Sequence, residues 1–113
     1  MNRILSIVES AYRDTPGREN DALWVAAALE SSGAVVSILL RGNAVNYVVR
    51  TGDGAGAAEK IETLTGKGVM VYAVREDARD RGLDPGRVVS GIEFISRTDI
   101  ADLVEKHDRI WYW

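Results

Sequence analysis

Three consecutive charged residues, Arg75, Glu76 and Asp77, follow an apolar stretch at 69–74 and open a predicted helix. Ligands of parallel α/β sheets bind outside the carboxyl ends of the strands, so this triplet is a candidate pocket. Arg75 can hold an anion bidentately, but the two carboxylates complement the positive end of the helix and disfavour a bound phosphate or thiolate. The alternative is ordinary helix capping with an Asp77–Arg81 pair at i,i+4 spacing, which needs no ligand.

Residues that commonly perform catalysis are scarce in this chain. It contains no cysteine, and His107 is its only histidine, which excludes two-histidine metal sites and dyads. His107 follows Ile100 by seven residues on an apolar helix face, a spacing typical of a packing role. We therefore predict no catalytic residue, no metal and no cofactor. An enzyme that uses Arg75 and Asp77 without a thiol is a less favoured hypothesis.

The stretch at 52–57, Gly-Asp-Gly-Ala-Gly-Ala, matches the pattern G-x-G-x-x-A and precedes a predicted helix. Asp77 follows about 20 residues later, as in a dinucleotide fingerprint. That fingerprint belongs after the first strand, however, and the helix here is short. A flexible glycine loop is therefore the favoured interpretation over nucleotide binding.

Length and charge narrow the class of protein. The 113 residues suit one domain, 1–113, and 46% hydrophobic with 27% charged residues is a globular balance. The net charge of −3 and the absence of a basic stripe argue against direct nucleic-acid binding. No apolar run approaches the roughly 20 residues that cross a membrane. We expect a cytoplasmic protein without a signal peptide or membrane partner.

Apolar segments alternate with helical ones along the chain. The predicted strands are 4–8, 35–40, 69–74, 92–95 and 110–113. The predicted helices are 22–29, 57–64, 76–81 and a last one that Thr98 caps and that runs to about Lys106. Residues 44–49 fit either a helix or a strand. Strands that are apolar on both faces predict a three-layer α/β fold with a parallel sheet of about five strands.

Two apolar features exceed what one domain needs. The helix at 22–29 is apolar around its whole circumference, whereas packing on a sheet needs a stripe of about 100°. This favours an oligomer interface that includes Trp24, although water also tolerates the alanines. At the end of the sequence, strand alternation places Trp111 and Trp113 on one side and Tyr112 on the other. These rings pack on helices or on a neighbouring subunit, so Trp24, Trp111 and Trp113 are the candidate interface.

Several stretches look familiar together. They are Ile-Leu-Ser-Ile-Val-Glu-Ser-Ala-Tyr at 4–12, Leu-Leu-Arg-Gly-Asn-Ala-Val at 39–45, Val-Tyr-Ala-Val-Arg-Glu-Asp-Ala-Arg-Asp-Arg-Gly-Leu at 71–83, Thr98-Asp99-Ile100, Lys106-His107 and Trp113. On these the chain resembles the DsrE/DsrF/DsrH (TusBCD) superfamily of sulfur-relay proteins, most closely its DsrH/TusB branch. The resemblance covers nearly the whole chain. It implies a DsrE-like fold and favours a helix at 44–49.

The resemblance also implies a role. Proteins of this kind form trimers or hexamers that pass persulfide sulfur, for 2-thiolation of the tRNA wobble uridine or for sulfur oxidation. The active cysteine of the DsrE branch stands eight residues before the glycine of its Arg-Gly pair, a position that is Val74 when counted from Gly82. The implied role is a non-catalytic subunit that assembles with DsrE-like and DsrF-like paralogues. The alternative is a homo-oligomeric module that binds a small ligand at the carboxyl end of the third strand.

Overall fold

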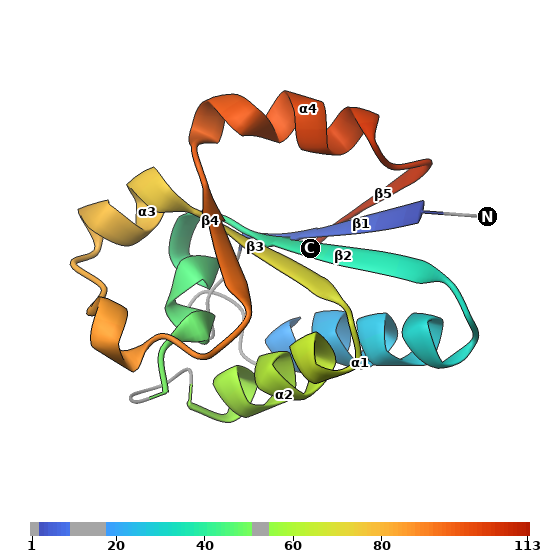
Figure 1. The fold of residues 1–113 in the computed structure, drawn as a ribbon, viewed down its shortest axis with the longest axis horizontal. Helices are drawn as coiled ribbons and strands as arrows, with labels where there is room; N and C mark the ends of the chain where they lie inside the picture. The colour runs from blue at the N-terminus through green and yellow to red at the C-terminus, as the bar shows by residue number, and fades with distance from the viewer. Residues whose placement is uncertain (1–2, 10–17, 51–54) are drawn as a thin grey trace.

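Five strands of the described residues form one parallel sheet in the order β4-β3-β2-β1-β5. A computed structural model describes residues 3–9, 18–50 and 55–113 (Figure 1). The strands are β1 (Arg3–Val8), β2 (Val35–Leu40), β3 (Met70–Val74), β4 (Ile92–Ile95) and β5 (Arg109–Tyr112). The predicted three-layer α/β fold with a parallel sheet is confirmed.

Helices cover both faces of the sheet. On one face lie α1 (Arg18–Ser31) and α2 (Ala55–Gly66), and on the other lies α4 (Ile100–Glu105) (Figure 1). Shorter elements gather beyond the carboxyl ends of the strands: η1 (Gly42–Val48), α3 (Arg75–Asp80), η3 (Pro85–Arg87) and η4 (Arg97–Asp99). The strand ends are therefore enclosed by short helical segments that can carry a site.

The core consists of two apolar clusters, one on each side of the sheet. Strand alternation sends Leu40 into the larger cluster, beneath α1 and α2, and its neighbour Leu39 into the smaller one, beneath α4. Leu23 of α1 and Ile61 of α2 pack into the larger cluster, and Leu103 of α4 packs into the smaller. Burial on both faces explains why the strands are apolar throughout.

Two local expectations are decided by the structure. Residues 44–49 fall mostly in the 3₁₀ helix η1, because Tyr47 and Val48 are buried against the larger cluster. The helix alternative is thus confirmed. The predicted cap at Thr98 is wrong: the Ser96 side chain accepts a hydrogen bond from the Thr98 backbone N–H, and Asp99 bonds back to the Ser96 N–H in a capping box. The helical segment begins earlier because η4 precedes α4.

The tight turn before β4 yields a stability prediction. Gly91 has φ +87°, and an added Cβ would lie 2.9 Å from the Cβ of Thr65. Gly91→Ala should therefore cost the strain of a left-handed residue, about 1–2 kcal/mol, plus an overpacking cost of about 1–3 kcal/mol. Gly33→Ala is the matched control, because Gly33 has φ +94° with open space around it. Urea unfolding should give a clearly lower midpoint for Gly91→Ala, and equal midpoints would contradict the predicted clash.

Candidate functional site

The carboxyl ends of the parallel strands bring charged and polar residues to one end of the sheet. Glu9 follows β1, Arg41 follows β2, Arg75 follows β3 and Ser96 follows β4. Parallel strands end at the same edge, so residues far apart in sequence meet there. This edge is the candidate functional site.

Asp77 joins three elements at this edge. Its Oδ2 accepts a hydrogen bond from the Gly42 N–H of η1 at 2.8 Å, and its Oδ1 accepts one from the Arg97 guanidinium of η4 at 2.7 Å. The side chain is only 13% exposed. Burial acts to raise the pKa of Asp77, but the hydrogen bonds from Gly42 and Arg97 outweigh it and lower the pKa. We call Asp77, Gly42 and Arg97 the Asp77 junction.

Glu76 ties α3 to the same turn. Its carboxylate accepts a hydrogen bond from the Arg97 backbone N–H at 2.9 Å and from the Ser96 hydroxyl at 2.8 Å. The Arg97 N–H is the main reason that the pKa of Glu76 is lowered. The sequence predicts that Glu76 and Asp77 serve chiefly the start of their own helix, whereas both reach across to neighbouring elements.

The predicted Asp77–Arg81 carboxylate pair is wrong. The Arg81 guanidinium donates to Asn43 Oδ1 at 2.8 and 3.0 Å and to the Asp77 backbone carbonyl at 3.1 Å. The Asp77 carboxylate forms its ion pair with Arg97 instead. Helical i,i+4 spacing makes a side-chain pair available, and the Arg81 charge still acts to lower the pKa of Asp77, but the ion pair forms with a tertiary partner.

A polar cavity of about 460 Å³ lies over the Asp77 junction. It is lined by Glu9, Arg41, Gly42, Asn43, Asp77, Arg81 and Arg97. The arginines are engaged with protein groups: Arg41 Nε lies 3.0 Å from Glu9 Oε1, and the Tyr112 hydroxyl donates to the same carboxylate. Arg41 and Arg97 are thus paired with carboxylates, whereas Arg81 donates to neutral acceptors.

Arg75 lies apart from Asp77. Its guanidinium donates to the Phe94 carbonyl of β4 at 3.3 Å and borders a second cavity, which α3 forms with η3 and β4. The three residues of the predicted pocket, Arg75, Glu76 and Asp77, therefore do not line one cavity. Arg75 borders the second cavity, Asp77 lines the polar one, and Glu76 is bound to Ser96 and Arg97.

Val74, the position to which the resemblance assigns the active cysteine of the DsrE branch, is the last residue of β3. Its side chain is fully buried, at 0% exposure, in the smaller apolar cluster with Leu5, Leu39 and Leu103. A side chain at this position points beneath α4 and away from solvent. The strand end that the resemblance associates with sulfur chemistry is therefore a packed apolar site in this chain.

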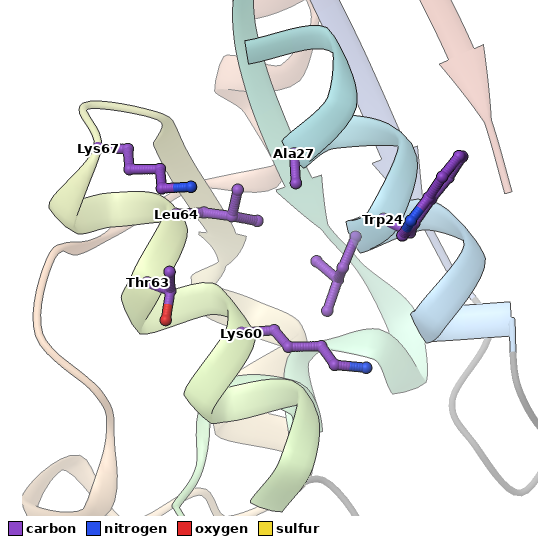
Figure 2. Close-up of a pocket in the computed structure, with 7 residues that line it drawn as sticks. Trp24, Ala27, Lys60, Thr63, Leu64 and Lys67 are labelled. Atoms are coloured by element: carbon purple, nitrogen blue, oxygen red, sulfur yellow. The ribbon is translucent and has the colours of Figure 1, made fainter. Parts of the chain in front are cut away.

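The aromatic residues of the predicted interface have different surroundings. Trp24 is 72% exposed at the cleft between α1 and α2, which Lys60 and Lys67 also border (Figure 2). Trp111 stands beside Ser6 on the α1 side of the sheet and is partly exposed, whereas Trp113 packs against the larger cluster. Trp24 and Trp111 are therefore accessible to a partner, and Trp113 contributes mainly to the core.

Other predicted features can be placed briefly. His107 is half-buried, with Nδ1 2.7 Å from the Leu103 carbonyl, consistent with packing. Positions 52–54 of the glycine pattern lie outside the described residues. Across 3–9, 18–50 and 55–113, no group of three metal-ligating side chains occurs. In the same segments, no helix has the length and apolarity to cross a membrane.

The sequence leaves several site residues unflagged. Glu9 and Arg41 directly follow predicted strands. Because sites of parallel sheets lie at the carboxyl ends of the strands, this position could have identified both as site residues. Arg97 and Phe94 belong to no motif. They reach the site because β4 pairs with β3, a long-range contact that local patterns do not contain.

The sheet order, the parallel pairing and the enclosed carboxyl edge define a three-layer parallel α/β protein. The model of the family described as DsrH-like protein matches residues 20–110, and the chain therefore belongs to the DsrH-like family. The resemblance to the sulfur-relay superfamily and its DsrH branch is thus confirmed. No curated protein matches the chain.

Three solved structures show the same fold. YchN from E. coli has a TM-score of 0.86 at 21% identity, with 100% of both chains covered. BT1422 from Bacteroides thetaiotaomicron, a conserved protein of unknown function, has a TM-score of 0.76 at 15% identity, covering 99% of this chain and 95% of its own. MTH1491 from Methanobacterium thermoautotrophicum, also of unknown function, has a TM-score of 0.68 at 20% identity. The match covers 98% of this chain and 99% of MTH1491.

The Asp77 junction predicts a pH-dependent stability. Because the pKa of Asp77 is lowered in the folded protein, its carboxylate stabilises the fold above the unfolded pKa of about 3.9. That stabilisation is lost as the pH falls through the folded-state pKa. Asp77→Asn should lower the free energy of unfolding at pH 7 by about 1–3 kcal/mol and flatten its decline below about pH 5.

Urea unfolding between neutral and acidic pH measures both effects. The matched control is Asp102→Asn, which removes an exposed aspartate of α4 and should change the stability by less than about 0.5 kcal/mol. If Asp77→Asn and Asp102→Asn had the same pH profile, the Asp77 junction would not contribute as described.

Proposed function

We propose that this chain is a non-catalytic, cysteine-free subunit of a DsrEFH/TusBCD-like sulfur-relay assembly in the cytoplasm. Membership of the DsrH-like family supports a place in such a relay. The sulfur it helps to move serves tRNA wobble-uridine thiolation or sulfur oxidation, the two pathways that the superfamily resemblance implies. Its own contribution is a folded surface that partners recognise.

The observation that carries this proposal is the chemistry at Val74. Persulfide transfer requires a thiolate to attack the incoming sulfur, and this chain has no cysteine anywhere in its sequence. At the end of β3 the valine side chain is buried in apolar surroundings. Sulfur therefore travels on the cysteines of DsrE-like and DsrF-like partners, while this subunit supports the assembly.

The cleft between α1 and α2 is the best candidate surface for those partners. Exposed tryptophans are among the residues that contribute most to protein interfaces, and Trp24 stands at the edge of an apolar cleft of about 450 Å³ (Figure 2). Ala22, Leu23 and Ala26 of α1 face the core, whereas Trp24 and Ala28 face outward. One apolar side of α1 therefore packs on the core, and the other, which carries Trp24, is exposed and suits a partner.

A cysteine at the end of β3 should be a poor sulfur acceptor. In Val74→Cys the thiol lies in apolar surroundings, where burial raises its pKa and blocks access. Incubation with a cysteine desulfurase and radiolabelled cysteine, followed by a non-reducing gel, should label Val74→Cys weakly. Ser32→Cys, which places a thiol at the exposed end of α1, is the control and should label more strongly. Stronger label at Val74→Cys than at Ser32→Cys would contradict the burial argument.

Assembly should depend on Trp24. Because the ring is exposed, Trp24→Glu should leave the far-ultraviolet circular dichroism unchanged while weakening self-association or partner binding. Sedimentation equilibrium, with and without the cysteine-bearing partners, measures the effect. Met70→Glu, an equivalent change at an exposed apolar side chain at the start of β3, is the control. A wild-type chain that stays monomeric with and without those partners would argue against the proposed interface.

A homo-oligomeric module that binds a small ligand is the second candidate, favoured by one observation. Arg75, at the carboxyl end of β3, borders a cavity with apolar walls. Purification from the native host separates the two candidates. The relay subunit brings down DsrE-like chains, and Arg75→Ala does not change this. The binding module brings down a stoichiometric small molecule that Arg75→Ala loses.

A further inference from the structure

The cavity beside α3 differs in character from the polar one over the Asp77 junction. Its volume is about 570 Å³, within the range of small-molecule sites. Six of its lining residues are apolar: Ala78, Leu83, Pro85, Val88, Val89 and Phe94. Three elements, α3, η3 and β4, contribute to it, so its shape is set by packed secondary structure.

Two arginines border this apolar cavity. Arg75 and Arg79 are four residues apart on α3 and therefore lie on the same side of the helix. Arg75 donates to the Phe94 backbone carbonyl, which leaves its charge uncompensated. Among the described residues, the side chain of Arg79 has no ion pair and no hydrogen bond. The two like charges repel each other, and an anion between them would relieve this repulsion.

Three carboxylates near the arginines are engaged elsewhere, whereas Asp80, which directly follows Arg79 on α3, is exposed. Glu76 and Asp77 of α3 bind η1 and η4, on the side of the Asp77 junction. Asp84, before η3, accepts from the Gly86 N–H at 2.9 Å and lies 3.7 Å from the Arg87 guanidinium. On α3, Glu76 and Asp77 therefore form structural contacts with neighbouring elements, whereas Arg75 and Arg79 border the cavity.

We propose that this cavity binds a small organic anion, a carboxylate attached to an aromatic or branched aliphatic body. The planar guanidiniums suit the two oxygens of a carboxylate, and the apolar walls, with the ring of Phe94, suit the body of the ligand. The inference is independent of the relay role. It gives the second candidate function a location and a ligand class. The test uses the isolated chain, so its failure leaves the relay proposal standing.

The probe is 2-naphthoate, titrated into the isotopically labelled chain and followed by amide chemical shifts. Saturable shifts should appear at Ala78, Leu83 and Val89, with a dissociation constant below about 1 mM. Two further arms separate the contributions. Inorganic phosphate supplies charge without the apolar body, and 2-naphthylmethanol supplies the body without charge. Both should bind at least about 10-fold more weakly than 2-naphthoate.

Two variants assign the charge requirement to this site. Arg79→Gln should weaken 2-naphthoate binding about 10-fold or more, since it removes a charge-assisted contact. Arg109→Gln makes the same change at the start of β5, the outer strand on the side of the sheet opposite β4, and should have no effect. The proposal is overturned by a dissociation constant above about 1 mM, by equal binding of either comparison compound, or by unchanged binding in Arg79→Gln.

Discussion

Parallel pairing of the strands is the constraint on which the rest of this structure depends. It places the carboxyl ends of β1 to β4 at the same end of the sheet, so the short elements that follow these strands must pack against one another there. Asp77 makes this sharing possible, because one carboxylate satisfies a backbone N–H of η1 and the guanidinium of Arg97 at once. Its low exposure strengthens both contacts, since a partly buried pair is less screened by water.

The same arrangement accommodates a member of the DsrH-like family whose sequence contains no cysteine. Family membership concerns the fold, while chemistry depends on particular side chains. At Val74 the end of β3 is packed in apolar surroundings. On α3 the acids Glu76 and Asp77 hold neighbouring elements. On its other side Arg75, which bonds the Phe94 carbonyl, and Arg79 both stand at an apolar cavity.

The sequence predicts the parts of this structure that local patterns encode. Apolar runs give the strands within about a residue, because a strand buried on both faces needs apolar side chains at every position. Local patterns cannot predict the Asp77 junction, because Gly42 and Arg97 lie 35 and 20 residues from Asp77 in the chain. The misplaced cap at Thr98 has a similar origin: both Ser96 and Thr98 suit a cap, and the tertiary contact of Ser96 with Glu76 favours Ser96.

Native mass spectrometry tests the central claim most directly. The chain would be co-expressed with the cysteine-bearing DsrE-like and DsrF-like proteins of the same genome and loaded by a cysteine desulfurase. A relay subunit without a thiol should appear in one complex with those proteins, and the added sulfur atoms should be found on the partner chains alone. A sulfur-carrying complex of the partners that excludes this chain, with the chain present only as copies of itself, would contradict the account.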